Sequence, residues 1–242
     1  SCVQTPQPAI TCDQKATFDT TTCSWSITTS IQFNQNTSVG LSNDISNSWG
    51  MAWGDYDNDG FEDLYVAEYE MSNGSFLYHN NGNGTFTKDS SIVIAIDGGS
   101  SIAGTWGDYN NDGNLDLFVA NNTGALNALY KNNGSGNFTK ITTGGIANYS
   151  GYCHGATWVD YNNDGYLDMF VTDYMPTRFN LLYKNNGDET FTQITNSALV
   201  QEAKYSIGAT WADYDNDGDM DVFVPATSGQ SNSLFRNNGA GA

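Results

Sequence analysis

The sequence predicts an all-β chain, a β-propeller-like array of four blades that are each a four-stranded antiparallel sheet. Two observations carry this prediction. A segment of the form W-x-D-Y-[DN]-N-D-G begins at Trp53 and returns at Trp106, Trp158 and Trp211, with successive starts 53, 52 and 53 residues apart. A Leu-Tyr or Leu-Phe pair, one basic residue and Asn-Asn-Gly return in step with it. Repeats of about 40 to 50 residues with four strands each are typical of propeller blades.

The strands of one repeat follow from its local sequence. Residues 63–67, after the acidic loop, form a short β-branched and aromatic run, as expected of a buried strand. Leu-Tyr before Asn-Asn-Gly and Thr-Phe-Thr after it predict two strands joined by a turn, because Asn and Gly accept positive φ. Residues 90–105 are rich in Gly and Ser and end in apolar residues before Trp106, which predicts the remaining strand. No segment has a convincing helical pattern.

The register of the repeat predicts how the array is completed. Residues 31–242 form a four-repeat propeller-type domain. Counted from the Phe of each Phe-Thr strand, its units are residues 33–85, 86–137, 138–190 and 191–242. The sequence ends after Asn-Asn-Gly, before a Phe-Thr strand of the last repeat. We therefore expect residues 31–35 to pair with residues 233–236, which leaves no open edge strand if the ring closes.

Residues 1–30 lie outside the repeats and form a Cys- and Thr-rich N-terminal extension. The four cysteines, Cys2, Cys12, Cys23 and Cys153, lack the C-x-x-C spacing of zinc or thioredoxin-type sites. An even count in an acidic, Lys-poor chain indicates disulfides and an exported protein. Three pairings are possible. We favour Cys12 with Cys23, and Cys2 with Cys153 or with a neighbouring chain; free buried thiols are the alternative.

Each repeat carries an acidic loop of the form D-x-[DN]-x-D-G-x-x-D, called loops 1 to 4 in chain order. Oxygen donors at positions 1, 3, 5 and 9 converge, and the Gly at position 6 lets the position 7 carbonyl join them. Such a set suits Ca²⁺, whereas Mg²⁺ prefers fewer protein ligands and more water. The ligands predicted for four Ca²⁺ ions, one per repeat and with position 7 acting through its backbone carbonyl, are Asp55, Asp57, Asp59, Phe61 and Asp63; Asp108, Asn110, Asp112, Asn114 and Asp116; Asp160, Asn162, Asp164, Tyr166 and Asp168; and Asp213, Asp215, Asp217, Asp219 and Asp221.

An EF-hand is the obvious rival, because its loop also begins D-x-[DN]-x-[DN]-G. It requires a bidentate Glu at position 12 and flanking helices. Position 12 is apolar in all four loops: Val66, Val119, Val171 and Val224. The EF-hand interpretation therefore fails.

The nine-residue loop that ends in a strand resembles the calcium loop of FG-GAP or VCBS repeats, the blades of the integrin α-subunit propeller and of many secreted bacterial proteins. Four copies carry this resemblance over residues 33–242. The literal F-G…G-A-P string is replaced by forms such as Gly104-Thr105-Trp106. The resemblance implies a β-propeller-like fold with Ca²⁺ in loops between adjacent strands of a blade.

Candidate catalytic residues are few. His79 and His154 are the only histidines, and His79 occupies the position of Lys131, Lys184 and Arg236, which predicts a polar surface residue. There is no G-x-S-x-G, P-loop or H-E-x-x-H motif. A fourfold repeated metal site is expected to be structural, because a catalytic metal site is normally singular and keeps an open coordination position. We therefore predict that the chain is not an enzyme.

The repeated aromatic residues are predicted to pack between blades and not to bind sugar. They are the loop tyrosines and the tryptophans that precede each loop: Tyr56, Tyr109, Tyr161 and Tyr214 with Trp53, Trp106, Trp158 and Trp211.

Charge excludes several classes of partner. The 242 residues include 27 acidic and 8 basic side chains, for a formal charge of −19. Nucleic acids and anionic membrane surfaces both require Lys and Arg that are scarce here, and no apolar run approaches the roughly 18 residues of a membrane span. Of the 27 acids, 14 are predicted carboxylate ligands at positions 1, 3, 5 and 9, and four Ca²⁺ would bring the charge to −11.

These features predict an extracellular or cell-surface, calcium-binding and non-enzymatic protein with a structural or adhesive role. Four blades are the lower limit for a closed ring. The four units could close alone, form half of a dimeric ring, or stack into a filament, so self-association is expected. The alternative is a glycan- or protein-binding module of a larger secreted protein or enzyme.

Overall fold

The computed structural model describes residues 15–28, 35–41, 46–69 and 74–239. The chain divides into two compact units, residues 1–38 and 39–242. In the first unit, β1 (Lys15–Asp19) and β2 (Ser24–Thr28) form an antiparallel pair in which the Phe18 and Trp25 rings lie 5.2 Å apart. Cys2 and Cys12 lie outside the described residues, so the Cys12–Cys23 pairing stays a prediction.

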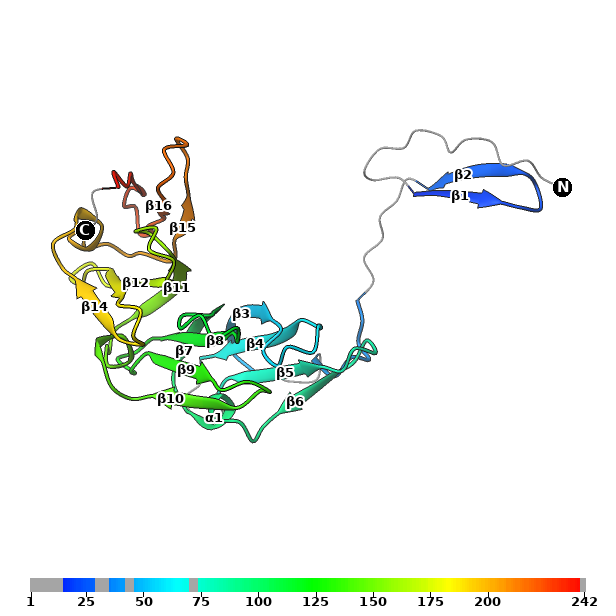
Figure 1. Cartoon of the computed structure of the whole chain (residues 1–242), viewed down its shortest axis with the longest axis horizontal. Coiled ribbons are helices and arrows are strands. Elements are labelled where there is room, and N and C mark those ends of the chain that lie inside the picture. The colour runs from blue at the N-terminus through cyan, green and yellow to red at the C-terminus, as the bar shows by residue number, and fades with distance from the viewer. Residues whose placement is uncertain (1–14, 29–34, 42–45, 70–73, 240–242) are drawn as a thin grey trace. The chain divides into compact units, whose positions relative to one another are not determined.

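The second unit contains four antiparallel sheets, each built from strands that are consecutive in the chain (Figure 1). Sheet 1 contains β3 (Ser48–Gly54), β4 (Asp63–Glu68), β5 (Phe76–Asn80) and β6 (Phe86–Asp89). Sheet 2 contains β7 (Ser101–Gly107), β8 (Asp116–Asn121), β9 (Ala128–Asn132) and β10 (Phe138–Ile141). Sheet 3 contains β11 (Cys153–Val159), β12 (Asp168–Asp173), β13 (Leu181–Asn185) and β14 (Phe191–Ile194). Sheet 4 contains β15 (Thr210–Ala212), β16 (Asp221–Val224) and β17 (Ser233–Phe235).

The predicted all-β class is confirmed, and sheets 1 to 3 have the predicted four antiparallel strands. The Phe-Thr strand ends each of these sheets, so the sheets are offset by one strand from the units counted in the sequence. Within the described residues, sheet 4 has three strands. The expected pairing of residues 31–35 with residues 233–236 falls largely on residues outside the described part and stays a prediction. No helix in the described part is long and apolar enough to span a membrane.

Short helical turns join the sheets, although the sequence pattern predicted no helix. They are α1 (Val93–Ile96) and the 3-10 turns η2 (Gly145–Ala147) and η3 (Ala198–Val200). These turns bury apolar side chains against the neighbouring sheets: Ile94 from α1, Ile146 and Ala147 from η2, and Leu199 and Val200 from η3. A single turn is too short to produce a helical periodicity, so packing and not propensity fixes these elements.

Neighbouring sheets are held together by repeated aromatic residues, as predicted for the inner repeats, whereas Trp53 and Tyr214 are 54% and 52% exposed. The Tyr56 ring stacks on Trp106 of the next sheet with centroids 6.1 Å apart and planes 15° apart, and Tyr109 stacks on Trp158 at 6.1 Å and 7°. The Phe of the last strand completes each group, because Phe138 lies 5.8 Å from Tyr56 and Phe191 lies 5.6 Å from Tyr109. These residues fill the space between sheets and are not available to a ligand.

The third junction lacks this Phe within the described residues. A cavity of about 290 Å³ lies there, lined by Tyr161, Trp211, Val222 and Phe235 among others. Tyr161 and Trp211 are the equivalents of the pairs that contact Phe138 and Phe191. The cavity therefore lies at the place in the repeat where Phe138 and Phe191 pack at the first two junctions.

Cys153 corrects one predicted disulfide. It lies on β11 in the core between sheets 2 and 3, is fully buried and carries a free thiol. The Asn127 Nδ2 atom lies 3.4 Å from its sulfur. The Cys2–Cys153 pairing is therefore wrong, because packing against the neighbouring sheet closes the thiol off.

A buried Asn also ties each sheet to the preceding one. It is the first Asn of Asn-Asn-Gly, at the end of β9 and β13. Asn185 Nδ2 donates to the Leu167 carbonyl in its own repeat (3.0 Å) and to the Tyr109 carbonyl in the preceding repeat (2.7 Å). Its Oδ1 atom accepts the Gly187 N–H. Asn132 and Asn237 make the same two kinds of bond.

Replacing Asn185 by Ala is expected to destabilise the repeat unit more than Asn80→Ala. Loss of the Asn185 side chain leaves two buried carbonyls without their donor, at about 1–3 kcal/mol for each unsatisfied group. Asn80 holds the same position in sheet 1, and within the described residues its Nδ2 atom donates to the Glu62 carbonyl of its own repeat alone. Urea denaturation followed by tryptophan fluorescence measures both variants; equal losses of stability would contradict the bridging role.

Candidate metal centres

The four acidic loops share one backbone conformation, which the Asp at position 1 stabilises. In loop 1 the two Asp55 oxygens accept the Asp59 and Gly60 N–H groups at 3.0 and 2.9 Å. Asp108, Asp160 and Asp213 make the same pair of bonds in loops 2 to 4. The residues at positions 4 and 6 adopt positive φ, 59° at Asn58 and 91° at Gly60. Asn and Gly are the residues that tolerate this region best, so the sequence itself favours the tight loop.

The Asp at position 9 anchors the loop to the sheet. Asp116 begins β8 and is fully buried; one carboxylate oxygen accepts the Tyr109 N–H (3.3 Å) and the other the Asn132 N–H (2.7 Å). Asp63, Asp168 and Asp221 repeat this arrangement. One side chain thus joins the loop to the second and third strands of its sheet.

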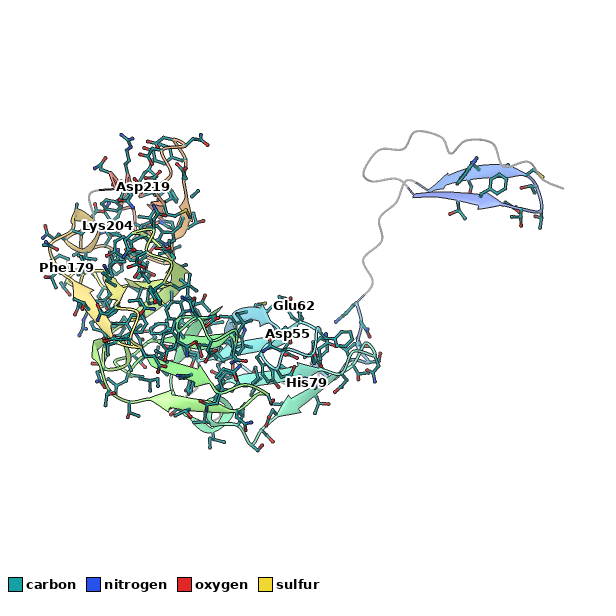
Figure 2. The ribbon with its side chains drawn as sticks, in the orientation of Figure 1. Asp55, Glu62, His79, Phe179, Lys204 and Asp219 are labelled. Atoms are coloured by element: carbon teal, nitrogen blue, oxygen red, sulfur yellow. The ribbon has the colours of Figure 1, made fainter. Side chains whose placement is uncertain are left out.

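In loops 1 and 4 the structure brings the predicted ligands at positions 1, 3 and 9 together. One carboxylate oxygen from each of Asp55, Asp57 and Asp63 lies within 4.8 Å of the others, and Asp213, Asp215 and Asp221 form the equivalent group. Asp57 Oδ1 is buried and has no hydrogen-bond partner. A buried unpartnered carboxylate oxygen facing two other carboxylates fits a hard cation. Figure 2 labels Asp55 in loop 1 and Asp219 in loop 4.

The carboxylate at position 5 of each loop accepts a hydrogen bond from the backbone N–H of position 7. The Asp59 carboxylate accepts the Phe61 N–H at 2.9 Å, and Asp112, Asp164 and Asp217 cap the N–H of Asn114, Tyr166 and Asp219 in the same way. In loops 2 and 3 position 3 is an amide: Asn110 Oδ1 accepts the Asp112 N–H and Asn162 Oδ1 accepts the Asp164 N–H. These two loops therefore offer one negative charge fewer than loops 1 and 4.

Burial raises the carboxyl pKa at position 9 of loops 1 to 3. It raises the pKa of Asp116 and of Asp168 to about 7, and that of Asp63 to about 6. In each case desolvation outweighs the two backbone N–H bonds, and nearby loop carboxylates raise the pKa further. At pH values below these pKa values, the fold without a cation therefore holds protons on Asp63, Asp116 and Asp168.

The basic residue before Asn-Asn-Gly also belongs to the site, which the sequence interpretation missed. His79 was predicted to be a polar surface residue, but its Nδ1 atom lies 3.1 Å from Asp57 and 3.3 Å from Asp63. Arg236 pairs with Asp215 at 2.6 Å and with Asp217 at 2.8 Å. Lys184 lies 3.5 Å from Asp164. The only signal in the sequence was the repeated basic character of this position.

His154, the other histidine, lies in an aromatic group away from the acidic loops. Its ring stacks on Tyr174 with centroids 4.1 Å apart, and Nε2 lies 2.9 Å from Asn122 Nδ2. Burial lowers its pKa. These contacts account for His154 as a packing residue.

Neighbouring four-stranded sheets, each with an acidic loop after its first strand, define a repeat protein with a β-propeller-like fold. The sequence model of the FG-GAP-like repeat matches residues 55–119, 108–171 and 162–224. The chain belongs to the FG-GAP-like repeat family, as its loops predicted.

Relatives of known name match part of the chain. Mouse cartilage acidic protein 1 is 26% identical over 178 residues, which are 68% of this chain and 27% of the mouse protein. Human cartilage acidic protein 1 is 28% identical over 126 residues, 50% of this chain and 19% of the human protein. The match therefore spans about a quarter or less of these relatives.

A solved structure of an Agrocybe aegerita lectin, described for specific recognition of non-reducing terminal N-acetylglucosamine, resembles the fold. The TM-score is 0.50 at 19% identity, over 79% of this chain and 50% of the lectin chain. At this identity the likeness concerns the fold alone.

The free energy of unfolding of the calcium-free chain is expected to fall as pH rises from about 4 to about 7. The pKa of Asp116 is about 7 in the folded chain against an ordinary 3.8. Between these values the folded chain holds a proton that the unfolded chain has released, so each such group lowers stability by up to about 1.4 kcal/mol per pH unit. Thermal melts followed by circular dichroism in calcium-free buffer measure the slope.

Asp116→Asn is the matched control, because it removes one titrating group from the folded chain. Its stability should change less steeply with pH than that of the wild type. A calcium-free stability that rises between pH 4 and pH 7 would contradict the raised pKa values.

Proposed function

We propose that the chain is an extracellular, calcium-binding and non-enzymatic protein with a structural or adhesive role, which associates with further copies of itself. The observation that carries the proposal is the convergence of three carboxylates, one of them buried, in loops 1 and 4. Three like charges about 4 Å apart repel by roughly 4 kcal/mol per pair at an effective dielectric near 20. A divalent cation relieves this repulsion, and the repetition of the loop along the array supports a structural ion.

The proposed ligands are those predicted from the sequence, with Ca²⁺ held at positions 1, 3, 5, 7 and 9 of each loop. Calcium would fix the loop and neutralise the position 9 carboxylate at the head of the second strand. Sites of this kind suit the outside of a cell, where extracellular modules bind calcium with dissociation constants of about 10⁻⁴ to 10⁻³ M. The predicted Cys12–Cys23 disulfide belongs to the same proposal.

Position 3 offers a sharp test of the calcium sites. Asp215→Asn turns loop 4 into the form that loops 2 and 3 already have, so the variant should still bind four Ca²⁺, with roughly tenfold weaker affinity at one site because ligand charge tunes the affinity. Asp215→Ala removes the ligand oxygen and should leave three Ca²⁺ per chain. Isothermal titration calorimetry counts the ions; a wild-type chain that binds none would overturn the calcium proposal.

The second candidate function is a glycan- or protein-binding module of a larger protein. The observation that favours it is the likeness of the fold to a sugar-binding lectin. The full chain in millimolar Ca²⁺, applied to a glycan array, should bind no glycan under the structural proposal. Saturable binding of one terminal sugar would promote the second candidate above the first.

A further inference from the structure

The two outer faces of the sheet array expose large apolar side chains that the inner sheets bury. On sheet 1, Trp53 is 54% exposed. On sheet 4, Tyr214, Phe223 and Leu234 are 52%, 38% and 58% exposed. Their equivalents in the other sheets include Tyr109, Phe118 and Leu129, which are at most 1% exposed. The sequence therefore places core residues at both ends of the array.

The internal junctions show what these residues contact when they are covered. A loop Tyr stacks on the Trp of the following sheet, and the Phe at position 11 of the repeat meets the same Trp edge-on. Phe118 lies 6.3 Å from Trp158 at 78°, and Phe170 lies 5.7 Å from Trp211 at 88°. Among the described residues, Tyr214 and Phe223 of sheet 4 pair with no Trp ring, and Trp53 of sheet 1 pairs with the Phe86 ring but with no loop Tyr.

Two Asn side chains of the end repeats lack, within the described residues, a hydrogen bond that their equivalents make to a neighbouring repeat. Asn58, Asn111 and Asn163 each donate from Nδ2 to the loop of the following repeat. Asn216, their equivalent in loop 4, has no side-chain hydrogen bond within the described part of the chain. At the other end, Asn80 Nδ2 makes its bond within its own repeat but lacks the preceding Tyr carbonyl that its equivalents reach.

The sheet 1 side of such a junction is already assembled. Leu41 lies 53 residues before Ile94, the residue of α1 that packs between sheets 1 and 2. Leu41 packs in the same way on the outer face of sheet 1, against Leu64 and Tyr78. Trp53 lies 6.0 Å from Phe86, as Trp106 does from Phe138.

We propose that the exposed face of sheet 4 docks on the outer face of sheet 1 of a second copy of this chain. Tyr214 and Phe223 then contact Trp53 of that copy, and Leu234 is buried between the sheets. The inference rests on the self-association in the proposed function and names its interface. Each copy carries both surfaces, the sheet 4 face and the outer face of sheet 1, so the contact is head-to-tail. Such a contact forms a ring if the rotation between copies closes and a filament if it does not.

Single charges at either end test the interface in the full chain. Trp53→Glu blocks the sheet 1 side and Leu234→Glu the sheet 4 side. Both side chains are exposed within one copy, so the fold should persist. Leu126→Glu is the matched control, because Leu126 is 51% exposed and lies in the connection between β8 and β9, away from both ends. Sedimentation velocity in millimolar Ca²⁺, over a range of protein concentrations, gives the mass of each variant.

The wild type and Leu126→Glu are expected to exceed the mass of one chain increasingly with concentration, while Trp53→Glu and Leu234→Glu stay at one chain. An equimolar mixture of the two blocked variants retains one intact junction and should give two-chain complexes and nothing larger. A wild type that stays at one chain, or a blocked variant that assembles like the wild type, overturns the interface.

Calcium bound per chain, counted on the same samples, separates the two proposals. Loss of assembly in Trp53→Glu with calcium binding unchanged supports the interface. A chain that binds four Ca²⁺ and never assembles overturns the interface and leaves the calcium proposal standing. A chain that assembles through these ends but binds no Ca²⁺ overturns the calcium proposal and leaves the interface standing.

Discussion

The buried carboxylate at position 9 of each acidic loop is the interaction on which the rest of the repeat depends. Asp116 accepts one N–H from its own loop and one from the end of β9. These bonds set the direction in which the chain leaves the loop and the place where the Asn-Asn-Gly turn begins. A carboxylate without solvent is costly unless it is paired or neutralised. Burial accordingly raises the pKa of Asp63, Asp116 and Asp168, and a nearby cation would favour their ionised forms.

The same residues that form the loop also build the contact to the next sheet. The Tyr at position 2 makes three contacts, as Tyr109 shows. Its N–H donates to the buried Asp116, and its carbonyl accepts from the bridging Asn185 of the following repeat. Its ring stacks on the Trp of the following sheet. The shape of the loop and the packing of the neighbouring sheets therefore depend on the same residue. A change that loosens the loop would also move the aromatic ring on which the neighbouring sheet rests.

The sequence predicted the strands and the aromatic packing because both depend on residue type at short range. Residues 63–67 form a buried strand on their own composition, and a Tyr and a Trp recur at fixed positions in every repeat, as packing residues do. The bridging by Asn132 was not predicted, because Asn-Asn-Gly is a sufficient turn signal by itself. The pairing of His79 with Asp57 joins residues far apart in the repeat. Cys153 was misassigned because parity of cysteines says nothing about which of them a neighbouring sheet covers.

The loops lie next to one another along the array, which has consequences for how ions would act on it. Asn58 bonds Asn114 of the next loop, and Asn111 bonds the Gly165 carbonyl of the loop after that. A cation that fixes one loop therefore also fixes an acceptor or donor for its neighbour, because the partner of each bond lies inside the adjacent acidic segment. Stability in a linear array is a sum of repeat and neighbour contributions. Calcium at these loops would contribute to both, so its effect on the array would exceed that of four independent sites.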